Sequence, residues 1–241
     1  MSSECASVHK LTNELERHSF PFEESGIPLN GIYVLFQRGE VGHQKGRIVR
    51  VGTHTGENQL RSRLKQHFCS KNKDRSIFRK NIGRALLYQN NDPFLKYWEL
   101  DLTTRKAKNK YSSSIDFGYQ KNIECQVSQY IQSNFSFAAF EVISKEERLD
   151  VESKLISTVS WCDECKPSND WLGNSSPKEK IVKSGLWLVN ELYKSPCNAK
   201  DIQRLSRQIK RSYILNAPKA IIGKNLTITA GGNHDRPKQD P

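Results

Sequence analysis

The amino-acid sequence predicts a mixed α+β fold, with a small antiparallel sheet that contains a hairpin and is flanked by helices. The first observation is a pair of β-type runs between residues 31 and 53, separated by turn residues, which is typical of a hairpin. The second is a set of segments in which apolar residues recur every three or four positions, as on one face of a helix. With 241 residues, the chain is long enough to bury a hydrophobic core between these elements.

The predicted order starts with a short helix over residues 7–19, which Pro21 ends. The hairpin follows, and the alternation of side chains along a strand divides each run between two faces. In the first run, Ile32, Val34 and Phe36 share one face, and Tyr33, Leu35 and Gln37 share the other. In the second run, the two faces carry Val49, Val51 and Thr53, and Ile48, Arg50, Gly52 and His54. Residues 38–47 form a long, basic connection, so we expect a contact loop there.

Beyond the hairpin, helices and strands are expected to alternate. The predicted helices cover residues 57–68, 77–88 and 120–132, and Ser76 is expected to cap the second of them. The predicted strands cover residues 93–100 and 136–143. The polar stretch 103–114 has no periodicity, and we expect an insertion loop there.

The helix over residues 144–160 has the clearest signals in the sequence. It opens on a capping box, in which Ser144 and Glu147 satisfy two free backbone N–H groups. Glu152 falls within its apolar stripe, where an unpaired carboxylate would cost several kcal/mol. We therefore expect Glu152 either to pair with a buried Arg or Lys, or with Arg148, or to bind a metal ion. Glu124, beside the stripe of the preceding helix, is a weaker candidate ligand.

The C-terminal part is predicted to be largely helical and basic. A helix or strand over residues 181–193 precedes a basic amphipathic helix over 198–215. Its charged residues are Arg204, Arg207, Lys210 and Arg211. This helix either lies along phosphates or presents a solvated face.

We expect four units along the chain. They are an N-terminal helical extension (1–29), a central domain (30–175) with an insertion near 93–134, a basic helical region (176–225) and a flexible tail (226–241).

The composition narrows the class of partners. The formal net charge is +12, from 38 Lys and Arg against 26 Asp and Glu, which favours polyanionic partners and disfavours cationic ligands. No apolar run approaches the roughly 20 residues needed to span a bilayer. The N-terminus lacks a charged start followed by an apolar segment. We therefore expect a cytoplasmic protein with no membrane partner.

Six cysteines in a chain of this size do not indicate a disulfide scaffold, and a reducing compartment fits better. Cys162 and Cys165 have the spacing of two thiolates on one zinc ion. No second close pair exists in the sequence, so Cys197 with His67 or His54 would have to complete such a site through folding. A pair of plain reduced cysteines is the simpler interpretation.

The order of these features resembles the GIY-YIG nuclease superfamily. The first motif is present as Gly31-Ile32-Tyr33 at the start of a strand. The second motif, usually Tyr-Ile-Gly, is present as Arg50-Val51-Gly52. The resemblance covers roughly residues 31–173, so the central domain would be a GIY-YIG-like nuclease core with helical additions. It identifies four further site residues: Arg63 and His67 on the next helix, Glu152 on the capped helix, and Asn169 downstream.

This resemblance implies a metal-dependent endonuclease that hydrolyses phosphodiester bonds of double-stranded DNA. Tyr33 would position or deprotonate the attacking water with help from Arg50, because a free phenol holds its proton at neutral pH. Arg63 would hold the non-bridging phosphate oxygens. His67, one helical turn later, would relay the proton. Glu152 would bind one Mg²⁺ or Mn²⁺, and the products would carry 5′-phosphate and 3′-hydroxyl ends.

The basic residues of the connection and of the C-terminal helix are the expected nucleic-acid contacts. These residues are Lys45, Arg47, Arg204, Arg207, Lys210 and Arg211.

Two departures from the family pattern leave alternatives open. Arg50 replaces the second tyrosine, and the interval between Tyr33 and Arg50 is longer than in the usual hairpin. Both fit a restriction-enzyme-like subfamily, or a non-catalytic nucleic-acid-binding protein on a degenerate nuclease scaffold. An RNA nuclease is a third possibility. One chain has one such site, so cutting both strands would require a homodimer or two successive nicks.

Overall fold

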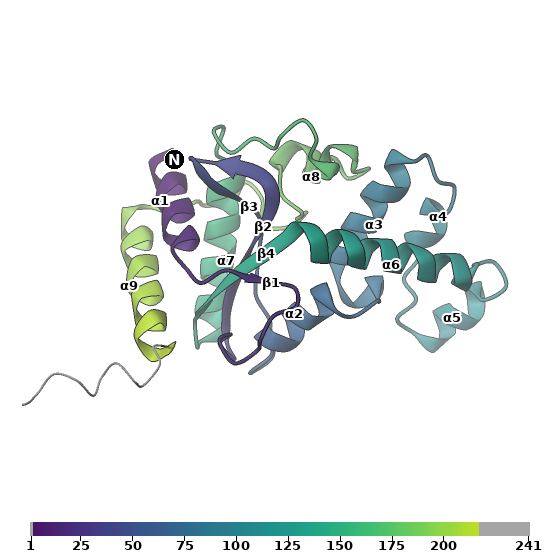
Figure 1. Ribbon diagram of the computed structural model, residues 1–241, viewed down its shortest axis with the longest axis horizontal. Coiled ribbons are helices and arrows are strands. Elements are labelled where there is room, and N and C mark those ends of the chain that lie inside the picture. The colour runs from purple at the N-terminus through teal and green to yellow at the C-terminus, as the bar shows by residue number, and fades with distance from the viewer. Residues whose placement is uncertain (1, 217–241) are drawn as a thin grey trace, which may run out of the picture.

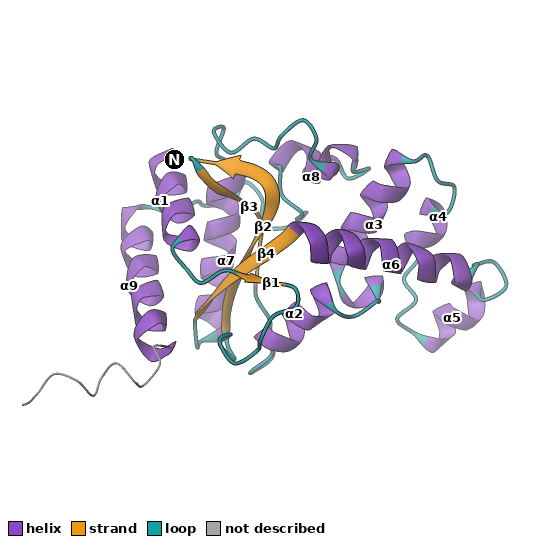
Figure 2. Cartoon of the chain, viewed as in Figure 1, coloured by secondary structure: helices purple, strands orange, loops and turns teal. Residues whose placement is uncertain are grey.

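In the computed structural model of the protein, residues 2–216 are described, with side chains through Ser212. A twisted antiparallel sheet lies between two groups of helices (Figure 1), and its strands are drawn in orange in Figure 2. The strands are β1 (His18–Ser19), β2 (Gly31–Gly42), β3 (Lys45–Gly52) and β4 (Phe135–Glu141). Their order in the sheet is β1-β4-β2-β3, and each neighbouring pair is antiparallel. The predicted α+β class with a small antiparallel sheet is confirmed.

The larger helices are divided between the two faces of the sheet (Figure 1). On one side lie α1 (Ser2–Asn13), α7 (Lys145–Ser160) and α9 (Ala199–Asn216). On the other lie α2 (Leu60–Phe68), α3 (Ile77–Gln89) and α6 (Phe117–Asn134). Short helical segments connect them: η1 (Lys73–Arg75), α4 (Leu95–Trp98), α5 (Arg105–Tyr111), η2 (Leu172–Ser175) and α8 (Glu179–Ser184).

Each face of the sheet packs into its own hydrophobic cluster. Ile32, Val34 and Phe36 of β2 are buried with side chains of α1, α7 and α9. Tyr33 and Leu35 are buried with side chains of α2, α3 and α6. The predicted alternation along β2 is therefore confirmed, and it decides which helices can reach the Tyr33 side chain.

The second strand departs from its predicted alternation at Ile48 and Val49. Leu35 pairs with Arg50 and Phe36 pairs with Ile48, so Val49 is an extra residue in β3. This β-bulge turns Val49 toward the cluster of Tyr33, whereas Ile48 packs on the opposite face. The predicted faces of Ile48 and Val49 are therefore wrong, because the sequence does not reveal the bulge.

The connection between β2 and β3 is not the long contact loop that we expected over residues 38–47. The strands continue to Gly42 and Lys45, and the turn between them consists of His43 and Gln44. Both turn residues have positive φ, 50° and 59°, as in the two-residue turns that match the twist of a hairpin. The register of β2 against β3 shifts between Phe36 and Val41, so the polar residues of this stretch belong to β2 without regular pairing. Their polar character is why the sequence of this stretch resembles a loop.

The segment predicted as a strand over residues 93–100 is helical instead. Asp92 accepts a hydrogen bond from the Phe94 backbone N–H at 2.8 Å, and α4 begins at Leu95. The Trp98 indole then donates to the Lys80 carbonyl at 2.9 Å, so a tertiary contact with α3 overrides the β propensity of the segment.

The segment predicted as an insertion loop over residues 103–114 contains α5. Thr104 caps this helix by accepting a hydrogen bond from the Ala107 N–H at 3.1 Å.

The remaining predicted elements, including the C-terminal helix over 198–215 that is α9, agree in type with the structure, apart from residues 181–193. Ser76 and Ser144 cap α3 and α7 as expected. The first helix, α1, begins and ends earlier than the predicted 7–19. Within residues 181–193 the structure has the end of α8 followed by irregular chain. The predicted tail over 226–241 lies outside the described residues. In the described part of the chain, no helix has the length and apolar character needed to cross a membrane.

Candidate active site

Tyr33 lies on β2 opposite Gly52 of β3, which places the two predicted motifs side by side. A Cβ atom added at Gly52 would overlap with the Tyr33 hydroxyl, so a glycine is needed for the phenol ring to cross this point. Gly31 has a similar role, because a Cβ there would overlap with the Phe140 carbonyl of β4. The glycines of both motifs therefore permit close approaches around Tyr33.

A chain of hydrogen bonds leads from the Tyr33 hydroxyl into the protein. The hydroxyl lies 2.7 Å from His67 Nε2, and His67 Nδ1 lies 2.7 Å from Ser76 Oγ. Ser76 Oγ also accepts the Arg79 backbone N–H at 3.2 Å as the cap of α3. If Ser76 Oγ accepts the His67 Nδ1 proton as well, Nε2 is left as the acceptor for the Tyr33 hydroxyl.

His67 is held in its neutral form by its surroundings. It is fully buried, and this burial, together with the charges of Arg50, Arg63 and Arg79, lowers the pKa of His67 well below its usual range. A neutral imidazole can accept a proton from a neighbouring hydroxyl.

Glu152 reaches the end of the hairpin from the other face of the sheet. It lies on α7, and its Oε1 accepts a hydrogen bond from the Thr53 backbone N–H at 3.1 Å, directly after Gly52. Burial raises the pKa of Glu152, while the nearby Arg50 charge and the Thr53 N–H act in the opposite direction. The half-buried acid expected from the sequence is therefore partnered by a backbone amide and faces the hairpin.

Two adjoining cavities open at this point. One, of about 310 Å³, is lined by Glu152, Arg63 and His54, among others. The second, of about 410 Å³, is lined by Glu152, Arg50 and Asn81, among others. Glu152 therefore lines both the cavity of Arg63 and the cavity of Arg50.

The two arginines differ in how tightly they are held. Arg50 is 4% exposed, and it donates to the Trp187 carbonyl at 2.5 Å and from Nε to the Tyr33 hydroxyl at 3.4 Å. Arg63 is half-buried, with one nitrogen 3.1 Å from both the Gln66 side-chain oxygen and the Arg75 carbonyl. Arg50 thus connects Tyr33, which is fully buried, with the cavity that Glu152 lines.

Comparison with known proteins decides the family. A family model described as the GIY-YIG domain matches residues 7–213, which is most of the chain. The chain belongs to the GIY-YIG family. No curated protein and no solved structure gives a match.

GIY-YIG domains are nuclease domains, so the family implies nuclease activity on nucleic acid. The match includes α1 and most of α9, which lie outside the central unit expected from the sequence. Both helices pack into the hydrophobic cluster on one face of the sheet.

Two of the expected site residues do not join this GIY-YIG site. Asn169 is exposed and lines neither cavity, and its carbonyl accepts a hydrogen bond from Asn174. Glu124, the weaker candidate ligand, is enclosed by protein: its carboxylate accepts bonds from the Arg79 guanidinium at 2.7 Å and from the Lys73 backbone N–H. Glu124 therefore holds Arg79, which also donates to the His67 carbonyl at 3.2 Å. The Glu124 carboxylate is enclosed by these partners and is not open to a metal ion.

Of the expected nucleic-acid contacts, Arg47 is the one that the structure corrects. Its side chain is buried, with Nε donating to Glu40 at 2.8 Å and another nitrogen to the Gly185 carbonyl at 2.6 Å. It has no surface to offer a phosphate. Lys45 is exposed, as are three residues of α9: Arg207, Lys210 and Arg211. Arg204 is half-buried and pairs with Asp150 of α7 at 2.6 Å.

Sequence reasoning missed two asparagines in the second cavity. Asn81 on α3 is 1% exposed, and its side-chain N–H₂ has no hydrogen-bond partner among the described residues. Asn190 is exposed and lines the same cavity as Glu152. Asn81 lies next to Ile82 in the apolar stripe of its helix, and that polar position is the signal that could have identified it. No sequence signal marks Asn190.

Proposed function

We propose that this protein is a metal-dependent endonuclease that hydrolyses phosphodiester bonds of DNA. The observation that carries the proposal is the meeting of Glu152, Arg50 and Arg63 around two adjoining cavities at the end of the hairpin. Arg50 contacts the Tyr33 hydroxyl, which begins the chain of hydrogen bonds through His67 to Ser76. A carboxylate, two guanidiniums and a proton acceptor are the groups that this hydrolysis requires.

The residues at the cavities fit a hard divalent cation. Glu152 uses one carboxylate oxygen for a single backbone N–H and lines open space on both sides. Mg²⁺ and Mn²⁺ are commonly held in this way, by one or two carboxylates with water and phosphate oxygens completing the shell. When bound to Glu152, the ion would neutralise phosphate charge and assist the leaving oxygen.

Tyr33 and His67 are the groups that we assign to the attacking water. Because His67 is neutral, Nε2 has a free lone pair, and the Tyr33 proton can pass to it across the 2.7 Å bond while the phenol oxygen accepts a proton from water. The lowered pKa of His67 opposes this transfer in the free protein, so we expect it to occur when a bound phosphate compensates the charges of Arg50 and Arg63. The Ser76 bond at Nδ1 holds the imidazole in the orientation that this transfer needs.

The two arginines are assigned to the phosphate. Arg63 already lines the first cavity beside Glu152, and its planar guanidinium suits the non-bridging oxygens. Arg50 covers the Tyr33 hydroxyl and contributes to the wall of the second cavity. We expect a bound phosphate to draw the Arg50 guanidinium toward the cavity, which would uncover the hydroxyl for water.

The wider contact with DNA is assigned to exposed basic residues. Lys45, Arg207, Lys210 and Arg211 are available at the surface, and a net charge of +12 favours a polyanion. A duplex is the proposed substrate. The described part of a single chain contains one such site, so we expect nicking, or cutting of both strands through a homodimer.

One observation supports the second candidate function, a nucleic-acid-binding protein without catalysis. The Tyr33 hydroxyl is fully buried, and Arg50 takes the place of the second tyrosine in front of it. If Arg50 does not move, water cannot reach the phenol. Such a protein would bind DNA with a steep dependence on salt and cut nothing.

Incubation of supercoiled plasmid with the untagged protein and Mg²⁺ or Mn²⁺ separates these functions. We expect nicked or linear DNA with 5′-phosphate and 3′-hydroxyl ends. Glu152→Gln keeps an acceptor for the Thr53 N–H but removes the charge, and it should slow cleavage about 10²–10³-fold, as expected when several kcal/mol of transition-state stabilisation is lost. Glu179→Gln, at an exposed residue that pairs with Lys183, is the matched control and should cut normally.

Binding without cleavage under either ion would favour the second candidate function. An RNA of the same sequence, tested in competition, decides whether the sugar matters. Faster cleavage of RNA than of DNA would reject DNA as the substrate.

A further inference from the structure

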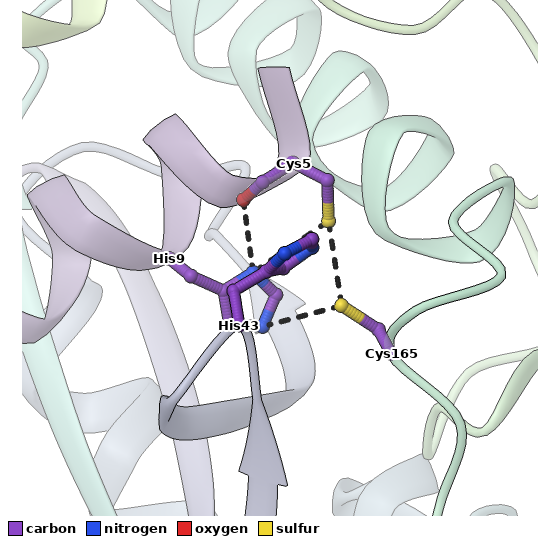
Figure 3. Close-up of side chains that lie close together, drawn as sticks. All are labelled: Cys5, His9, His43 and Cys165. Atoms are coloured by element: carbon purple, nitrogen blue, oxygen red, sulfur yellow. Dashed lines mark hydrogen bonds between the residues drawn. The ribbon is translucent and has the colours of Figure 1, made fainter. Parts of the chain in front are cut away.

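A second group of potential metal ligands lies at the other end of the hairpin. Cys5 and His9 of α1, His43 of the hairpin turn and Cys165 of the loop after α7 converge on one point (Figure 3). Their ligand atoms all lie within 4.8 Å of one another. The two cysteines and His9 are buried. None of these residues belongs to the candidate active site.

Cys162 extends this group, because its Sγ lies 3.3 Å from His43 Nε2. The Cys5 and Cys165 sulfurs are 3.5 Å apart. In a tetrahedral zinc site, Zn–S bonds of about 2.3 Å and Zn–N bonds of about 2.0 Å place two sulfurs about 3.8 Å apart, and a sulfur and a nitrogen about 3.5 Å apart. Both measured separations are within about 0.3 Å of these values, so a small shift of the side chains would bring each pair to the spacing of ligands of one ion.

His9 is the least suitable of the five groups, since both of its ring nitrogens have backbone partners. Nδ1 lies 3.0 Å from the Cys5 carbonyl, and Nε2 accepts the Ile48 N–H at 3.2 Å. With Nδ1 protonated, the one free lone pair of the ring is used by Ile48. Cys162 has the two-residue spacing to Cys165 that suits two thiolates on one ion.

We propose that Cys5, Cys162, Cys165 and His43 bind one structural zinc ion. Three sulfurs and an imidazole form a closed, soft set that prefers zinc over the hard cations expected at Glu152. The ion would join three segments that are far apart in the chain: α1, the hairpin turn and the loop after α7. This site does not depend on the proposed nuclease function.

The surroundings of His43 support its role as a ligand. Its Nδ1 lies 3.3 Å from a Glu164 carboxylate oxygen, and a carboxylate at the second ring nitrogen is the usual partner of a metal-bound histidine. The backbone of His43 has a φ of 50°, an uncommon conformation for a residue with a side chain. Gly42 leaves the needed room, because a Cβ there would lie 3.3 Å from the Cys165 sulfur.

Metal analysis of the untagged, full-length protein, purified without chelator, tests the proposal. We expect one zinc per chain, and X-ray absorption at the zinc edge should show three sulfur ligands and one nitrogen ligand. Cys165→Ser should lose the zinc, while Cys69→Ser, at an exposed cysteine outside the cluster, should retain it. His9→Gln should also retain the zinc.

A zinc chelator added to the wild-type protein gives a second test that does not rely on a variant that folds. Removal of zinc should lower the melting temperature, and addition of Zn²⁺ should restore it. Absence of zinc, in a protein that also fails to take it up when Zn²⁺ is added, would overturn the proposal. So would a disulfide between Cys5 and Cys165. Two sulfur and two nitrogen ligands would overturn the assignment of Cys162 in favour of His9.

Discussion

The two ends of the β2–β3 hairpin carry groups of opposite chemical character. At the open end, where Gly52 leads into Thr53, the oxygen ligand Glu152 and the cations Arg50 and Arg63 line cavities. At the turn end, sulfur and imidazole groups are packed against one another, and Cys5 and Cys165 are buried. One end can admit a substrate, whereas the other is arranged as an internal link.

This difference shows how one strand pair can serve two purposes. A hard cation exchanges its water and phosphate ligands readily, which suits a site that must release a product. A closed set of thiolates suits an ion that stays in place and contributes to folding. The side chains at the open end come from α2, α3 and α7 as well as the hairpin. Those at the turn end come from α1, the hairpin turn and the loop after α7. We therefore expect damage at one end to leave the other intact.

The largest expected effect is on cleavage, at the open end alone. Tyr33→Phe keeps the ring that crosses Gly52 but removes the hydroxyl bonded to His67. Loss of an acid–base group should slow DNA cleavage about 10²–10⁴-fold, with zinc content unchanged. Single-turnover rates and metal analysis on the same preparation measure both. Cleavage at the wild-type rate would remove Tyr33 from the mechanism.

The next largest effect is on the stability of the fold, and it arises at the buried Glu124–Arg79 pair, which supports the open end through His67. Glu124→Gln removes the charge that compensates Arg79 in a fully enclosed pair at 2.7 Å. Leaving one partner of such a pair uncompensated typically costs about 3–5 kcal/mol. We expect the free energy of unfolding, measured in urea, to fall by that order. Glu179→Gln, which breaks the exposed pair with Lys183, should change it by less than about 1 kcal/mol. Equal effects of the two substitutions would contradict a structural role for Glu124.

Local signals in the sequence were enough to predict most of the hairpin and the helices that support the site. Ser76 and Ser144 are caps that act within one helical turn, and both are in place. The motif glycines Gly31 and Gly52 lie where a paired strand comes too close for a side chain. Each is recognisable from the short motif that contains it. The ordered set of motifs then led to Glu152, which does face the hairpin.

Features that depend on distant partners could not be predicted in this way. Arg47 is in a basic stretch that looks exposed, but Glu40 and the Gly185 carbonyl enclose it. The Cys162–Cys165 pair was visible, but the sequence does not show that Cys5, which is 160 residues away from Cys165, and His43 complete it. Similarly, the side-chain N–H₂ of Asn81, which has no partner among the described residues, becomes notable only because Asn81 and Glu152 line the same cavity.

The smallest predicted effect is a dependence of stability on pH that arises at His67. Its pKa in the folded protein is well below the ordinary value of about 6.5 that it regains on unfolding. Above that value neither state binds the proton, and the full stability is present. Below it the unfolded state binds the proton while the folded state does not, so stability should fall by about 1.4 kcal/mol per pH unit until the folded pKa is reached.

His54 has a pKa that burial lowers as well, so the wild-type slope contains both histidines. His67→Gln isolates one contribution: between pH 7 and pH 5, its stability should fall less steeply than that of the wild type. Urea unfolding at a series of pH values measures this slope. Parallel curves for the two proteins would show that His67 accepts a proton as easily inside the fold as outside. A neutral imidazole could then no longer be assumed at the open end, whereas the zinc content of the turn end should be the same in both proteins at neutral pH.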